Sequence, residues 1–173
     1  MTARTAATRK AKGRKLEKQV AERYRYHKVD ETAQPMPLSG AMAHFKGDIH
    51  KRNDWEWVDE VKNHETIKLG EFWDQAVAQT SGGLRTPVLH ISSNYRPIIT
   101  VIRSSDFEGL AGEDRRRFDK IDITHLKRFT FWDQAQYCHD PVPRGMVVYC
   151  KVRGEDLVLM TIDTYMTLRK ENL

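Results

Sequence analysis

Hydrophobic residues at three-to-four-residue spacing predict two amphipathic helices in the first half of the chain. The first covers residues 14–27, where the charged residues lie on the other faces. The second covers residues 69–80, where Phe72, Ala76 and Gln79 follow helical spacing. It ends at Ser81-Gly82-Gly83, because glycine and serine favour turns over helix interiors. The apolar stripe of the first helix consists of Leu16, Val20, Tyr24 and His27.

Shorter apolar or alternating segments predict the strands. Residues 47–52 and 56–62 predict a hairpin, while the continuous apolar runs at 88–91 and 98–102 predict two neighbouring buried strands. Residues 28–46 contain prolines and a glycine among small and polar side chains, which predicts a long loop with one short edge strand. Loops of this length are usually functional or mobile. The order of helices and strands predicts an α/β domain with a mixed sheet.

The sequence Phe-Trp-Asp-Gln-Ala occurs at residues 72–76 and again at residues 131–135, an offset of 59. Two later apolar runs, at 146–149 and 157–160, match the earlier pair, and each pair leads to a polar helix-start signal. This correspondence predicts that the end of the chain contains a degenerate repeat of residues 72–107. The alternative is coincidence between common amphipathic patterns.

The length and composition are those of one compact domain, or of a domain with an elaboration. The chain has 173 residues, and 39% of them are hydrophobic, which is enough for a core without disulfides or structural metals. The mean hydropathy of -0.67 and the lack of an apolar run near the ~20 residues that a bilayer requires exclude an integral membrane protein. The two cysteines, Cys138 and Cys150, form no CxxC pair, which indicates a reducing, cytoplasmic compartment.

The positive charge is concentrated at the start of the chain. Residues 1–18 contain seven basic residues and one acid, whereas the whole chain has a net charge of only +5. Such a basic arm suits a nucleic-acid backbone, because each neutralised phosphate releases counterions. A solvated tail and a mitochondrial transit peptide are the alternatives, but the arm continues into a helix with a candidate catalytic residue, which argues against removal. The candidate DNA contacts in this arm are Arg9, Lys10, Lys12, Arg14 and Lys15.

The candidate chemistry lies in the predicted hairpin, where Asp48 stands twelve residues before Glu60-Val61-Lys62. Strand alternation places Glu60 and Lys62 on one face, and a turn through residues 53–55 brings Asp48 opposite Glu60. Two opposed carboxylates about 5 Å apart repel each other unless a cation lies between them. Mg²⁺ or Mn²⁺ fits this donor set, with the Val61 carbonyl as a further oxygen and Lys62 beside the attacking water. Together with the basic arm, this set predicts phosphodiester hydrolysis.

Other side chains near the hairpin have competing interpretations. Three histidines, His44, His50 and His64, would favour Zn²⁺ or another hydrolase if they bound a metal, but exposed histidines in a hairpin are ordinary. Trp55 and Trp57 are suited to stacking on unpaired bases, although core or dimer contacts are the more common role of such tryptophans.

The motifs resemble those of the PD-(D/E)xK nucleases, and within them the archaeal-type Holliday junction resolvases and their phage-encoded relatives. The likeness covers roughly residues 12–103. Gly47 stands where the motif usually has proline, and the segment after residue 104 lies beyond the minimal resolvase core. The matching elements are Lys12-Gly13 with Glu17, Ser39-Gly40, Gly47-Asp48-Ile49, Glu60-Val61-Lys62 and Gln75.

The resemblance implies a restriction-endonuclease-like core at residues 15–103, with a central mixed sheet flanked by helices. A basic N-terminal arm at 1–14 would precede it, and an α+β extension at 104–173 would follow. It also implies that Asp48 and Glu60 bind Mg²⁺, for which Mn²⁺ can substitute, and that Glu17 completes the site directly or through water. Lys62 would assist the attacking water, and Ser39 would lie on a mobile loop near the scissile strand.

By the same resemblance the protein would be a homodimeric, structure-selective endonuclease that cuts branched or four-way junction DNA in a prokaryotic or phage-infected cell. Ser39, Lys46 and Gln75 would join the basic arm in binding DNA. Another nuclease of this superfamily, of flap, nicking or restriction type, and a non-catalytic DNA-binding protein are the alternatives. In the predicted repeat, Asp119 and Ile121 take the positions of Glu60 and Lys62, so a second copy would be catalytically empty.

Overall fold

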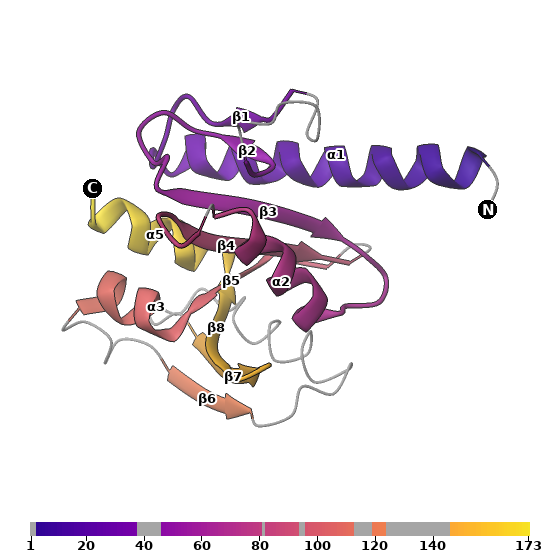
Figure 1. Cartoon of the computed structure of the whole chain (residues 1–173). Helices are drawn as coiled ribbons and strands as arrows, with labels where there is room; N and C mark the ends of the chain where they lie inside the picture. Colours follow the sequence, from indigo (N-terminus) through magenta and orange to yellow (C-terminus); the bar gives the residue numbers. More distant parts are fainter. Residues whose placement is uncertain (1–2, 38–45, 81, 94–95, 113–118, 124–145) are drawn as a thin grey trace.

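The computed structural model describes residues 3–37, 46–80, 82–93, 96–112, 119–123 and 146–173, and Figure 1 shows their arrangement. In these residues the main sheet has six strands in the order β3-β4-β5-β8-β7-β6. The outer pairs β3–β4 and β6–β7 are parallel, and the inner pairs are antiparallel, so the sheet is mixed as predicted. The strands are β3 (Trp57–Asn63), β4 (Thr86–Ser92), β5 (Ile99–Arg103), β6 (Asp119–Ile123), β7 (Met146–Val152) and β8 (Glu155–Thr161).

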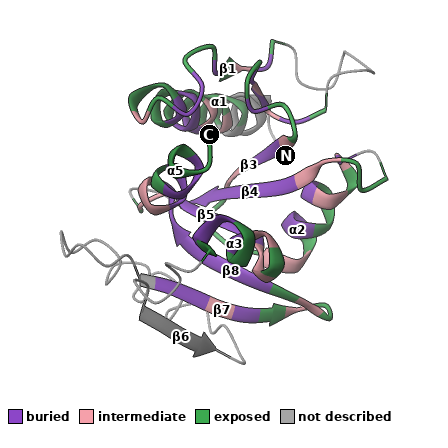
Figure 2. Cartoon of the chain, turned by 90° about the vertical axis from the view of Figure 1, so that its left-hand side faces the viewer, coloured by how far each residue is buried: buried purple, intermediate pink, exposed green. Residues whose placement is uncertain are grey.

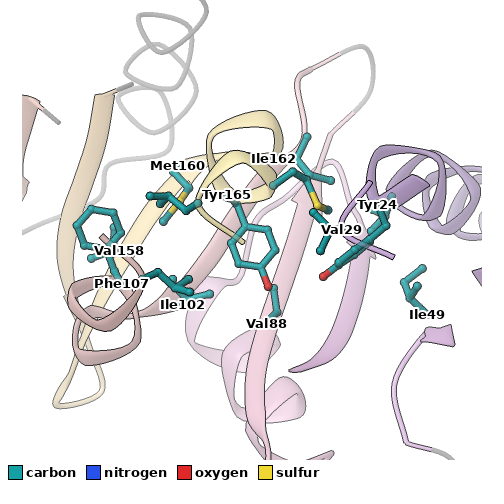
Figure 3. Close-up of a cluster of buried hydrophobic side chains, with 14 of the residues drawn as sticks. Tyr24, Val29, Ile49, Val88, Ile102, Phe107, Val158, Met160, Ile162 and Tyr165 are labelled. Atoms are coloured by element: carbon teal, nitrogen blue, oxygen red, sulfur yellow. The ribbon is translucent and has the colours of Figure 1, made fainter. Parts of the chain in front are cut away.

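Helices cover both faces of this sheet, which gives the α/β architecture of a restriction-endonuclease-like core. On one face α1 (Ala3–Tyr26), α3 (Ser104–Ala111) and α5 (Ile162–Glu171) bury a core that includes Tyr24, Phe107 and Tyr165 (Figure 3). On the other face α2 (Leu69–Ala78) packs Phe72 and Trp73 onto the sheet. Figure 2 shows that the strands between these layers are largely buried. None of the described helices is both long and apolar enough to cross a membrane.

Most elements agree with the predicted spacing. The second helix, the two apolar strands after it and the strands near residues 146 and 157 form where the pattern predicts them. The first helix starts at Ala3 and not near residue 14, because the basic segment is rich in alanine, lysine and arginine, which favour helix. Strand β6 was not predicted. The basic segment therefore forms the N-terminal half of α1, which projects beyond the sheet in Figure 1.

The predicted hairpin ladder is wrong. Strand β2 (Ile49–His50) pairs with β1 (Gln34–Pro35), and β3 pairs with β4, so no strand ladder joins β2 to β3 in the described residues. Asp48 at the start of this segment still bonds to β3, whereas the next two residues, Ile49 and His50, pair with Pro35 and Gln34 of β1 and so are not available to β3. Gly47, just before Asp48, has a φ of +100°. Proline cannot adopt this φ, which explains why glycine stands at this motif position.

The strand order is symmetric about the β5–β8 pair. The sequence β3-α2-β4-β5-α3 has a counterpart in β6, β7, β8 and α5, with the same parallel and antiparallel relations. The second Phe-Trp-Asp-Gln-Ala sequence lies at residues 131–135, outside the described residues. The internal repeat therefore stays a prediction, to which the strand order adds support.

The geometry at Gly47 predicts a stability cost for any side chain. A Cβ there would lie 3.0 Å from Val58 Cγ1 and 3.1 Å from the Asp59 carbonyl oxygen, at a strained φ. We expect Gly47→Ala to lower the free energy of unfolding by about 1–3 kcal/mol. Gly13→Ala is the control, because Gly13 lies inside α1 with nothing within 4 Å of the added Cβ, and alanine should raise stability by about 0.5–1 kcal/mol. Urea unfolding measures both, and equal effects would contradict the prediction.

Candidate active site

The free edge of β3 positions Asp48. The Asp48 backbone N–H donates to the Asp59 carbonyl at 2.7 Å, and the Asp48 Oδ2 accepts from the Val61 N–H at 2.8 Å. These two bonds go to the residues on either side of Glu60, so the structure places Asp48 alongside Glu60 although no strand ladder forms there. Because the N–H and C=O of a strand residue point to the same side, the Val61 carbonyl also faces this edge.

Glu60 is buried in β3, and both of its carboxylate oxygens have partners. Its Oε1 forms an ion pair with Lys62 Nζ, and its Oε2 accepts a hydrogen bond from Gln79 Nε2. Gln79 follows α2, and its Oε1 accepts from the Gly47 N–H. A single amide side chain thus joins the end of α2 to Glu60 and to the turn before Asp48.

The carboxylates at this edge influence each other electrostatically. Burial, followed by the negative charge of Glu60, raises the pKa of Asp48 to about 6. Burial, followed by the charge of Asp48, also raises the pKa of Glu17, which α1 places at the same edge. Arg14 lies 3.4 Å from the Glu17 carboxylate and donates to the Met36 carbonyl at 2.9 Å. Glu17, Asp48 and Glu60 therefore form one interacting set of acids.

This donor set suits a hard divalent cation, because it consists of carboxylates whose mutual repulsion a cation would relieve. Within the described residues, no group of three or more His, Cys, Asp or Glu side chains is already arranged as metal ligands. The Lys62 ammonium instead occupies one oxygen of Glu60, and Gln79 occupies the other. The residues fit a cation in chemical type, because each Glu60 oxygen with one partner can still accept a second.

The remaining predicted site residues have different positions. Lys10, Lys12 and Lys15 are exposed on α1, and Lys12 lies 3.8 Å from the Glu65 carboxylate. Lys46 and Gln75 are also exposed, so their binding of DNA stays a prediction. The predicted contacts that lie outside the described residues or side chains are Arg9 and Ser39.

Sequence reasoning missed Gln79 as a site residue. Its spacing from Phe72 and Ala76 assigned it to the packing face of the helix, whereas the contact with Glu60 needs a polar side chain at the helix end. Gln75, the predicted site glutamine, lies one turn earlier. The available signal was the i, i+4 spacing of the two glutamines, which places them on one side of the helix.

The structure distinguishes between the interpretations of the tryptophans and histidines near the predicted hairpin. Trp57 is partly buried and packs against Tyr165, with ring centroids 6.1 Å apart, so its packing role is confirmed. Trp55 is 59% exposed, so a core role for it is wrong. His50 and His64 belong to no cluster of metal-ligating side chains in the described part of the chain, and His44 lies outside that part.

Comparison with known proteins agrees with this geometry. The family model described as "Phage putative PDDEXK endonuclease" matches residues 8–139, which include Glu17, Asp48, Glu60 and Lys62. No curated protein and no solved structure matches the chain. Because the matched region covers well over half of the sequence and contains the whole candidate site, the chain belongs to this phage PDDEXK endonuclease family.

Proposed function

We propose that this protein is a Mg²⁺-dependent, structure-selective DNA endonuclease that resolves four-way junctions as a homodimer, with Mn²⁺ as a substitute metal. The observation that carries the nuclease assignment is the meeting of Glu17, Asp48, Glu60 and Lys62 at one open strand edge. The preference for junctions and the dimer rest on the resemblance of the motifs to those of resolvases.

Each residue of the site has a distinct role in this proposal. Asp48 and Glu60 hold the cation, with the Val61 carbonyl and Glu17 as further oxygen donors. A divalent cation supplies charge neutralisation of the attacked phosphodiester and activation of water. Lys62, already beside Glu60, orients the attacking water and offsets the charge that develops on the phosphate.

The projecting half of α1 is suited to hold the DNA backbone. Lys10 and Lys15 are exposed on this helix, and Glu17 at the site lies on the same helix. A phosphate backbone that follows α1 would therefore lead to the cation site, and its binding would weaken with rising salt. Trp55, which lies two residues before β3 and is 59% exposed, is suited to stacking on an unpaired base.

A cleavage panel tests the proposal. Labelled four-way, flapped, nicked and linear duplexes are incubated with Mg²⁺ and wild-type, Glu60→Ala or Lys62→Ala protein. We expect paired symmetric cuts in the junction alone for the wild type, and loss of cleavage with retained junction binding for both variants. Lys151→Ala, an exposed lysine on β7, is the matched control and should cut normally.

The other outcomes of this panel overturn defined parts of the proposal. Equal cleavage of linear duplex would exclude junction selectivity, and single-strand cuts would favour a nicking enzyme. A Glu60→Ala protein that cuts at the wild-type rate would falsify the assignment of the site. A wild-type protein that binds junctions without cutting would support the non-catalytic alternative.

The raised pKa of Asp48 predicts that Asp48→Asn stabilises the protein while it inactivates the site. The pKa is 3.8 for an ordinary Asp and about 6 here, so folding favours the protonated form, and its contribution to stability is lost as pH rises through this window. The ionised form costs about 3 kcal/mol at neutral pH. Asparagine keeps an acceptor for the Val61 N–H without the charge, so its stability gain should appear only as pH rises from about 4 to about 6.

Thermal unfolding as a function of pH measures this gain, and saturating Mn²⁺ supplies a second readout. Mn²⁺ should raise the unfolding temperature of the wild type at pH values above the pKa of Asp48 and leave that of Asp48→Asn unchanged. A variant that is less stable than the wild type at neutral pH would contradict this prediction, because burial and the charge of Glu60 would then not destabilise the ionised Asp48.

Gln79 provides a separate prediction. Gln79→Leu removes the amide that joins Glu60 to Gly47, and loss of such a supporting contact typically lowers metal affinity or activity about 10–100-fold. We expect turnover to fall in this range with little change in DNA affinity. Gln75→Leu, one turn earlier and exposed, is the control and should affect DNA affinity more than turnover. Steady-state cleavage and a binding titration separate the two, and identical behaviour would refute a specific role for Gln79.

A further inference from the structure

The opposite face of β3 carries a buried group of charged and polar side chains centred on Asp59, the residue before Glu60. Tyr24 Oη donates to Asp59 Oδ1 at 2.6 Å, and His90 Nε2 lies 2.9 Å from the same oxygen. Lys51 Nζ lies 2.7 Å from Asp59 Oδ2. Burial alone would raise the pKa of Asp59, but Lys51 and His90 together lower it to about 2. This carboxylate is therefore held in its charged form inside the protein.

The group extends to the C-terminal helix. Lys51 Nζ donates to Asp54 Oδ2 at 3.0 Å, and Arg169 of α5 pairs with Asp54 Oδ1. The Arg169 guanidinium also lies over the ring of Trp57, the first residue of β3, at 4.3 Å. In the same region Tyr165 of α5 and Tyr24 of α1 turn their hydroxyls towards each other (Figure 3). Helix α5 thus contacts both the charged group and the start of the catalytic strand.

We define the charged group as Lys51, Asp54, Asp59 and Arg169. The two negative charges of its aspartates equal the two positive charges of Lys51 and Arg169. All four residues are buried. Removing one member leaves an unbalanced charge in the interior, which is strongly destabilising, whereas hydrophobic replacement of a complete pair is often neutral. Stability alone therefore does not explain why charged residues occupy this position. A role in fixing the position of the strand β3 backbone explains it.

The geometric link to the active site is the backbone of Asp59. Its side chain is fixed by the charged group, and its carbonyl accepts the Asp48 N–H at 2.7 Å. The next residue, Glu60, points to the site face. A shift of Asp59 would therefore move both carboxylates that the proposed cation site needs.

We infer that Lys51, Asp54, Asp59 and Arg169 are positioning residues that hold Asp48 and Glu60 in register for cation binding. The inference rests on the proposed function, and it makes the C-terminal helix α5 a required part of the nuclease site. The charge balance, and not the identity of each residue alone, sets the geometry.

A charge-compensating pair of substitutions tests this inference. Arg169→Gln leaves the group with one excess negative charge, Asp54→Asn leaves it with one excess positive charge, and the double variant restores the balance. We expect each single variant to lose about tenfold or more in Mn²⁺ affinity and in kcat on junction DNA, with little change in KM. The double variant should recover most of both losses. Calorimetric titration with Mn²⁺ and steady-state cleavage provide these values at a temperature where circular dichroism shows every variant folded.

A matched control separates positioning from general destabilisation. Leu157→Ala removes buried side-chain volume from β8 on the α2 side of the sheet, away from the charged group. It should lower the unfolding temperature but leave Mn²⁺ affinity and kcat unchanged in the folded protein. Hydrogen exchange of the Asp48 and Val61 amides, both of which donate bonds at the site, should be faster in Arg169→Gln than in Leu157→Ala of equal stability.

The outcomes are distinct for the inference and for the proposed function. Single variants with wild-type Mn²⁺ affinity, kcat and amide exchange would overturn the inference, as would a double variant no better than the singles. A wild-type protein that neither binds Mn²⁺ nor cleaves DNA would overturn the proposed function, whereas the amide exchange would still report whether the charged group positions Asp48.

Discussion

The repulsion between Asp48 and Glu60 is the constraint on which the rest of the site depends. Two carboxylates lie side by side at the free edge of β3, and burial, followed by the negative charge of Glu60, raises the pKa of Asp48. The surrounding contacts offset part of this repulsion. The Val61 N–H binds Asp48, while Lys62 and Gln79 bind Glu60. Each of these partners carries less positive charge than a divalent cation. The negative charge of the carboxylates is therefore only partly neutralised, and this excess of negative charge is what attracts a cation to such a site.

The elements predicted well from sequence are those whose pattern is local. The strands β4, β5, β7 and β8 are short apolar runs because helices cover the sheet from both sides, and α2 follows helical spacing up to a glycine stop. The failures concern long-range choices. The local pattern of residues 47–52 does not indicate that β2 would pair with β1. The apolar run of β8 likewise does not indicate that this strand would lie beside β5. Those choices depend on packing between segments that are distant in the sequence.

The residues of the candidate site that would take part in the chemistry could be predicted from the sequence. The buried charged residues that support them could not. An acid at 48, an acid at 60 and a lysine at 62 can be read from the sequence, because their spacing and identity both matter for the reaction. Lys51, Asp54 and Asp59 resemble solvated hairpin charges in sequence, yet all three are buried. Arg169, the partner of Asp54, lies 115 residues after it, and no local pattern links residues so far apart.

The segment after residue 103 completes the fold of the residues before it. Strand β8 pairs with β5 over five residues, so without β8 the inner strand β5 would expose an unpaired edge and apolar residues such as Ile99 and Ile102. Helix α5 closes the face on which α1 lies, and the β7–β8 turn reaches α2 through an ion pair between Arg153 and Asp74. Strand β3, which carries the candidate site, remains at the far edge of this longer sheet, open on the side where Asp48 lies. The described part of this segment thus stabilises the interior of the sheet while it leaves the edge of β3 at Asp48 free.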